Sequence, residues 1–164
     1  MFEKFKLNYK KKVLFEIFFV FLIFVIDRVS KSIILHLSKI TGEFQMTLTS
    51  YLNLSLIWNR GIAFGLFSFE TNLYYNLISF LIGAIILLII IISKKSKGVE
   101  KISFLMIIGG ALGNLFDRFY YKSVIDFIDF SFQNFHWFIF NVSDIFISLG
   151  VIILILLEFK KKNE

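Results

Sequence analysis

Several ionisable or amide side chains lie inside otherwise apolar stretches of this sequence. Asp144 interrupts the apolar run over 138–157, and Asn141 precedes it by three residues. Asp27 and Lys31 are four residues apart, so they share a helix face and can pair. Ionisable groups within membrane segments are expensive, usually face the interior of a helix bundle, and indicate function.

A second polar group lies toward the end of another apolar run. Asn114 and Arg118 are four residues apart, and Gly110 continues the same helix face one turn earlier. Gly109 and Gly113 form a pair of small residues at the spacing that lets a neighbouring helix approach closely. This segment is therefore predicted to pack tightly and to present polar groups to its neighbours.

Carboxylate chemistry fits these residues better than nucleophilic catalysis. The sequence has no cysteine, which excludes a thiolate nucleophile, and only two histidines, too few for a multi-histidine metal site. It has no G-x-S-x-G motif, and the adjacent Ser30 and Lys31 point to different sides of a helix. Two carboxylates that share one proton can activate water: the ionised one accepts a proton from water, and the neutral one polarises the carbonyl and protonates the leaving amine.

Three carboxylate pairs are candidates: Asp126 with Asp144, Asp129 with Asp144, and Asp117 with Asp144. Spacing does not choose among them. Asp117 is also consistent with a fold-holding ion pair, and Asp129 with a solvated side chain. Asp144 is the hardest to explain structurally, because it is an uncompensated acid within an apolar run.

Composition predicts that membrane helices position these groups. Hydrophobic residues make up 57% of the chain and charged residues 18%, against about 45–50% and about 25% in soluble domains. A membrane helix needs roughly 20 apolar residues, which the chain of 164 residues can supply about four times. We expect one domain over 1–164 with spans at about 13–37, 73–92, 102–120 and 138–157.

The basic residues predict the orientation of these spans. Twelve of the 18 Lys and Arg residues lie in three groups that flank the apolar runs: Lys4, Lys6, Lys10, Lys11 and Lys12; Lys94, Lys95, Lys97 and Lys101; and Lys160, Lys161 and Lys162. The positive-inside rule makes both termini and the 94–101 loop cytoplasmic, with outer loops at about 38–72 and 121–137. We therefore interpret the net charge of +6 as a topology signal rather than a nucleic-acid surface.

The polar groups should then meet near the outer surface, together with Asn59 of the first outer loop. At about 1.5 Å per residue, we expect Asp144 to lie roughly 9 Å below Phe138. Alternation of apolar and polar residues over 48–58 predicts a β-strand, and 62–69 is either a strand or a short interfacial helix. The expected fold class is an all-α membrane protein: a four-transmembrane-helix bundle with a small extracytoplasmic β-sheet and a short interfacial helix.

Five segments, in this order, resemble the lipoprotein signal peptidase family, also called signal peptidase II. The resemblance extends from about residue 13 to 157, and the segments are Asp27 to Lys31, Asn59 to Gly65, Gly110 to Arg118, Val124 to Phe127, and Phe140 to Asp144. One such motif is weakly specific, whereas five in order on four predicted spans are strongly specific. Ser143 departs mildly from the pattern, which often has alanine at that position.

The resemblance implies a bacterial inner-membrane aspartyl endopeptidase that removes signal peptides from prolipoproteins, cleaving before the cysteine that carries diacylglycerol. Matching the motifs makes Asp126 and Asp144 the catalytic pair. The supporting or substrate-binding residues would be Asp27, Lys31, Asn59, Gly110, Asn114, Arg118 and Asn141.

The resemblance also implies the partners and location of the protein. Membrane lipids, diacylglyceryl prolipoproteins and globomycin-type inhibitors are the expected partners of a monomer whose active site faces the extracytoplasmic leaflet. We expect no metal, no cofactor and no nucleic acid. The alternative is a small membrane transporter or ion-conducting protein, but a transport path would place its polar groups near the midplane or across the membrane rather than at one end.

Overall fold

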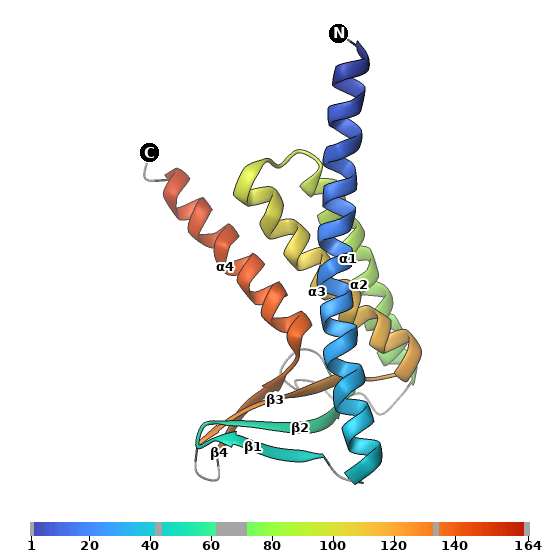
Figure 1. The fold of residues 1–164 in the computed structure, drawn as a ribbon, viewed down its shortest axis with the longest axis vertical. Coiled ribbons are helices and arrows are strands. Elements are labelled where there is room, and N and C mark those ends of the chain that lie inside the picture. The colour runs from blue at the N-terminus through green and yellow to red at the C-terminus, as the bar shows by residue number, and fades with distance from the viewer. Residues whose placement is uncertain (1, 42–43, 62–71, 133–134, 163–164) are drawn as a thin grey trace.

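The computed structural model describes residues 2–41, 44–61, 72–132 and 135–162. Its four helices are α1 (Phe2–Thr41), α2 (Asn72–Ser93), α3 (Gly98–Tyr121) and α4 (Val142–Lys162), and its four strands are β1 (Gln45–Thr49), β2 (Leu52–Asn59), β3 (Val124–Phe132) and β4 (Phe135–Phe140). Figure 1 shows the strands at one end of the helices, and both termini at the other.

Among the described residues, three helices are long and apolar enough to cross a membrane: Tyr75–Ser93 of α2, α3 and α4. Large apolar side chains cover their outer surfaces, such as Phe80, which is 74% exposed, and Leu156, which is 62% exposed. The helix α1 is not among the three, and it carries Glu16, Asp27, Arg28 and Lys31. Its membrane crossing therefore stays a prediction.

Helix α3 packs against each of the other helices, and its glycines allow the closest approaches. A Cβ atom added at Gly109 would lie 2.9 Å from the Cβ of Ile23 in α1. Gly113 lies between Asp27 of α1 and Ser143 of α4, with Asp27 Oδ2 only 2.7 Å from the position of such a Cβ. The prediction that this glycine pair admits a neighbouring helix is confirmed.

Replacement of Gly110 by alanine should destabilise the protein, because the added Cβ would lie 2.5 Å from the backbone oxygen of Ser143 and 2.9 Å from Cγ1 of Ile147. Overpacking of this kind costs about 1–3 kcal/mol. Thermal unfolding in detergent measures the loss. The matched control is Gly83→Ala in α2, where the new Cβ would meet only Leu115 Cδ2 at 3.9 Å. Equal melting temperatures for Gly110→Ala and wild type would contradict the tight α3–α4 contact.

The strands form one antiparallel sheet in the order β1-β2-β3-β4. A small apolar core of Ile34, Ile125 and Phe127 joins the sheet to the end of α1. Helix α3 ends at Tyr121, Lys122 adopts the left-handed conformation with φ 57°, and β3 begins at Val124. This sharp exit places the last turn of α3 next to the start of β3.

The structure corrects two sequence predictions about the outer segments. The single strand expected over 48–58 is a hairpin, β1 and β2. The loop expected over 121–137 contains all of β3 and the start of β4. Apolar β-branched and aromatic residues suit strands as well as buried helices, so hydropathy did not separate the two. The strand or short helix expected over 62–69 lies outside the described residues.

The fourth helix begins at Val142 rather than at 138. Phe138, Ile139 and Phe140 are residues of β4 and pair with Phe130, Asp129 and Ile128 of β3. Asp144 therefore lies in the first helical turn, and the expectation that Phe138 begins the helix, with Asp144 roughly 9 Å along it, is wrong.

Candidate active site

Asp126 and Asp144 line one cavity at the sheet end of the helices. Asp126 lies on β3, and Asp144 lies in the first turn of α4. The cavity has a volume of about 270 Å³; its other described lining residues are Asn59, Ile82, Ala111, Asn114, Arg118, Val124, Ile147 and Ser148. The structure thus brings together two carboxylates that are distant in sequence.

Asn141 connects the two carboxylates. Its side-chain Oδ1 accepts the backbone N–H of Asp144 at 3.1 Å, and its own backbone N–H donates to Asp144 Oδ2 at 3.1 Å. This reciprocal arrangement is a helix N-terminal capping box with aspartate in the third helical position. The remaining Asn141 group, Nδ2, donates to Asp126 Oδ1 at 2.6 Å. Asn141 therefore caps the N-terminus of α4 and is hydrogen-bonded to both carboxylates.

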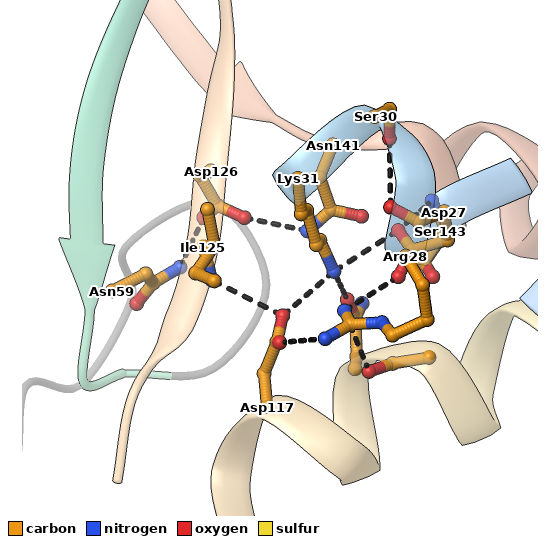
Figure 2. A network of polar contacts seen from close by, with 12 residues as sticks. Asp27, Arg28, Ser30, Lys31, Asn59, Asp117, Ile125, Asp126, Asn141 and Ser143 are labelled. Carbon is orange, nitrogen blue, oxygen red and sulfur yellow. Dashed lines mark hydrogen bonds and ion pairs between the residues drawn. The ribbon is translucent and has the colours of Figure 1, made fainter. Parts of the chain in front are cut away.

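Asn59 reaches Asp126 through the register of β2 on β3. Asn59 pairs with Val124, so Asp126 is its diagonal neighbour on the same face of the sheet. Asn59 Nδ2 donates to Asp126 Oδ2 at 2.8 Å, and its Oδ1 accepts the Gly61 backbone N–H at 2.8 Å. Figure 2 shows Asp126 between Asn59 and Asn141.

Asn114 donates a hydrogen bond to Asp144 as Asn59 does to Asp126. Its Nδ2 donates to Asp144 Oδ1 at 2.8 Å, while its Oδ1 accepts from Lys31 Nζ at 2.9 Å. In Asn59, Asn114 and Asn141 the amide oxygen is thus occupied by another donor, which leaves the amide N–H to face a carboxylate. The orientation of all three amides is fixed by their partners, and each one stabilises negative charge in the cavity.

Burial raises the pKa of Asp126 to about 7, with the negative charge of Asp144 as the next contribution. Hydrogen bonds from Asn59 and Asn141 oppose this rise. Asp126 is only 2% exposed. A carboxyl group with a pKa near the working pH can hold a proton at rest and still transfer it, which is the property needed of one member of an acid–base pair.

Arg118 lines the same cavity from the last turn of α3. Its Nη2 donates to the Gly61 carbonyl at 2.5 Å, and its guanidinium lies 5.4 Å from the centre of the Tyr75 ring. Its Nη1 is buried and has no hydrogen-bond partner among the described residues. Within the described part of the chain, Arg118 therefore offers an unpaired donor beside the two acids.

The other two candidate acids do not line this cavity. Asp117 is fully buried and forms ion pairs with Arg28 at 2.5 Å and Lys31 at 2.7 Å, consistent with the fold-holding interpretation. Asp129 is 1% exposed, so its interpretation as a solvated side chain is wrong. Asp27 pairs with Lys31 at 3.0 Å as predicted. Sequence reasoning did not include Arg28 among the predicted site residues. Its charge, next to Asp27 within an apolar run, could have indicated a role in the same ion-pair cluster.

A second cavity, of about 680 Å³, lies along α1, α2 and α3 and is lined almost wholly by apolar side chains. Its acid, Glu16, is paired with Lys101 at 3.0 Å. A single neutralised carboxylate cannot perform paired acid–base chemistry, so we do not place the site there. In the described part of the chain, no group of three or more histidine or acidic residues is arranged to hold a metal ion.

Comparisons with known proteins agree on one family. The family model described as "Signal peptidase (SPase) II" matches residues 19–160. A lipoprotein signal peptidase of Pelagibacter ubique (strain HTCC1062) is 46% identical over 97% of this chain and 98% of its own length. A lipoprotein signal peptidase of Anaplasma phagocytophilum (strain HZ) is 36% identical over 94% of this chain and 97% of its own length.

Solved structures show the same fold. A bacterial membrane enzyme determined by the in meso method at 2.3 Å resolution matches with a TM-score of 0.73 and 25% identity, over 90% of this chain and 88% of that one. A second such enzyme structure, at 1.9 Å resolution, matches with a TM-score of 0.70 and 27% identity, over 88% of this chain and 92% of that one.

Proposed function

This chain belongs to the signal peptidase II family, and we propose that it is an aspartic endopeptidase of prolipoproteins with Asp126 and Asp144 as its catalytic dyad. The assignment of this dyad is supported by one observation: both carboxylates line one cavity and accept hydrogen bonds from the same residue, Asn141. Because the chain belongs to the signal peptidase II family, we no longer favour the alternative of a transporter or ion-conducting protein.

In the proposed mechanism, the dyad holds one proton between two carboxyl groups. The raised pKa of Asp126 favours this residue as the proton holder near neutral pH. Asp144, which accepts hydrogen bonds from Asn114 and from the Asn141 backbone, takes a proton from the attacking water. Asp126 polarises the scissile carbonyl and then protonates the leaving amine. Nη1 of Arg118, which has no partner among the described residues, donates to a substrate carbonyl, and neither metal nor cofactor takes part.

The chain is proposed to cross the membrane four times as a single domain over 1–164, with α1 as the additional span. The ionisable residues of α1 do not prevent this, because Asp27, Arg28 and Lys31 are paired within the protein. Figure 1 places both termini and the α2–α3 connection at the end opposite the sheet. Since these segments carry the lysine groups, that end is assigned to the cytoplasm and the sheet to the extracytoplasmic leaflet.

The surroundings of the dyad suit a lipid-modified substrate. The cavity is lined in part by residues of α2 and α4, whose outer faces carry exposed apolar side chains such as Leu81 and Leu149. An adjoining apolar cavity of about 470 Å³, lined by Phe138, Phe140, Ile145 and Leu149, shares Asp144 and Ser148 with it. A signal-peptide helix and the diacylglyceryl chains can thus approach the dyad from the lipid, and a globomycin-type inhibitor would compete for this space. The enzyme is proposed to act as a monomer.

Reconstitution tests this function directly. The purified protein in lipid should cleave a diacylglyceryl prolipoprotein before its modified cysteine, and globomycin should block the cleavage. The matched substrate is the same preprotein without the diacylglyceryl group, which should be cleaved far more slowly because nothing anchors its scissile bond at the depth of the dyad. Gel mobility and mass spectrometry of the products report the result. Absence of cleavage, or cleavage that globomycin leaves unchanged, would contradict the proposal.

A further inference from the structure

Three buried charges and one partly buried charge form a closed cluster beside the dyad. The carboxylates of Asp27 and Asp117 are both bridged by Lys31, at 3.0 Å and 2.7 Å, and both bridged again by Arg28, at 2.7 Å and 2.5 Å. Asp27 and Asp117 are fully buried, Lys31 is 1% exposed, and the Arg28 side chain is 17% exposed. We call these four residues the ion cage; Figure 2 shows them grouped beside Asp126.

The two carboxylates of the ion cage make the same contact with the backbone. Asp27 Oδ1 accepts the backbone N–H of Ser143 at 3.1 Å, and Asp117 Oδ2 accepts the backbone N–H of Ile125 at 3.3 Å. Ser143 is the residue immediately before Asp144, and Ile125 is the residue immediately before Asp126. Each dyad acid therefore follows a backbone amide that is held by the ion cage.

Both of these amides lie at the start of a secondary-structure element, Ser143 in α4 and Ile125 in β3. Ser143 is in the first turn of α4, whose N–H groups have no acceptor within the helix. Ile125 of β3 pairs with Trp58 of β2 but has no partner in β4, because the β3–β4 ladder begins at Ile128. The carboxylates satisfy these donors, and a negative charge at the start of α4 is also favoured by the helix dipole.

We propose that the ion cage of Asp27, Arg28, Lys31 and Asp117 is the positioning element that sets the spacing of the dyad, through the amides of Ser143 and Ile125. This inference rests on the proposed function of Asp126 and Asp144 and extends it to Arg28 and Asp117. The four residues are positioning residues, because they act through the backbone or, for Lys31, through Asn114, and do not line the catalytic cavity.

The charge arrangement explains why this element can be rigid. Two acids and two bases make the cluster neutral, which reduces the penalty for burying each charge. Arg28 joins the two carboxylates through separate nitrogens, Nη2 to Asp27 and Nη1 to Asp117, which fixes the carboxylates' relative position. Lys31 also orients Asn114 toward Asp144. The same cluster thereby constrains α1, α3, β3 and α4.

The test is a kinetic comparison of Asp117→Asn and Arg28→Gln with wild type, with prolipoprotein as substrate. A displacement of reacting groups by about 1 Å costs on the order of 100-fold in rate, so we expect kcat to fall by roughly that factor with little change in KM. The high-pH limb of the kcat profile should move to lower pH, because separating the acids weakens the effect of Asp144 on Asp126. Arg28→Lys, which keeps the charge, should recover part of the activity lost in Arg28→Gln.

The matched control is Glu16→Gln, which breaks the Glu16–Lys101 ion pair of α1 and α3 away from the dyad. It should lower the melting temperature without changing kcat per folded molecule or the pH profile. If Asp117→Asn does not accumulate, Asp117→Glu tests the same point, because it keeps the charge but shifts the carboxylate by one methylene. Wild-type kcat and pH profile in Asp117→Asn or Asp117→Glu would overturn the ion cage, whereas activity in Asp126→Asn or Asp144→Asn would overturn the dyad itself.

Discussion

Asp126→Asn and Asp144→Asn are each expected to abolish prolipoprotein cleavage while the protein still folds and inserts. Asparagine has nearly the shape of aspartate but cannot accept or donate the transferred proton. Positioned acid–base catalysis contributes about 10²–10⁴-fold per group, and each substitution also removes the charge balance of the pair. We therefore expect a rate loss of at least about 10⁴-fold for either variant. Single-turnover cleavage by reconstituted protein measures it.

Asp129→Asn is the matched control for this experiment. Asp129 is also a buried aspartate of β3, three residues from Asp126, but it does not line the cavity. The same isosteric change there should leave cleavage per folded molecule close to wild type. Cleavage that survives in Asp126→Asn and is lost in Asp129→Asn would instead support the pair of Asp129 with Asp144.

The second large effect is a pH dependence of stability that Asp126→Asn removes. The pKa of Asp126 rises from 3.8 to about 7 on folding, so between these values the folded state binds a proton that the unfolded state has lost. The unfolding free energy therefore falls as the pH rises through this window. At 1.36 kcal/mol per unit of pKa shift, wild type should lose roughly 3 kcal/mol more than Asp126→Asn between pH 4 and pH 7, since each titration is only about half complete at its end of this range.

Unfolding of both proteins in one detergent, followed across this pH range, measures the difference. Below the lower value Asp126 is protonated in both states and contributes nothing to the slope, and above the upper value its contribution is constant. The difference between the two proteins isolates Asp126 from the other carboxylates. Parallel stability curves for wild type and Asp126→Asn would show that Asp126 is ionised in the folded protein across the range.

The helices were the most predictable part of the fold. The spans expected at 73–92 and 102–120 correspond to α2 (Asn72–Ser93) and α3 (Gly98–Tyr121). A long apolar run bounded by lysines is rarely compatible with any structure other than a membrane helix. The segment 124–140 was not predictable in this way. Its Val, Ile and Phe residues fit a strand or a buried helix, and only pairing with β2 made it a sheet and moved the start of α4 to Val142.

The sequence by itself determined the family, the apolar helices and the local pairs, such as Asp27 with Lys31, because spacing along one helix fixes which side chains are neighbours. Residue types alone left three carboxylate pairs open, and the family motifs favoured one. Only the tertiary structure brought Asp126 to Asn59, 67 residues away, and Asp27 to Ser143, 116 residues away. Such contacts depend on strand register and helix packing, where a shift of one residue moves a side chain to the other face, so spacing along the chain does not encode them.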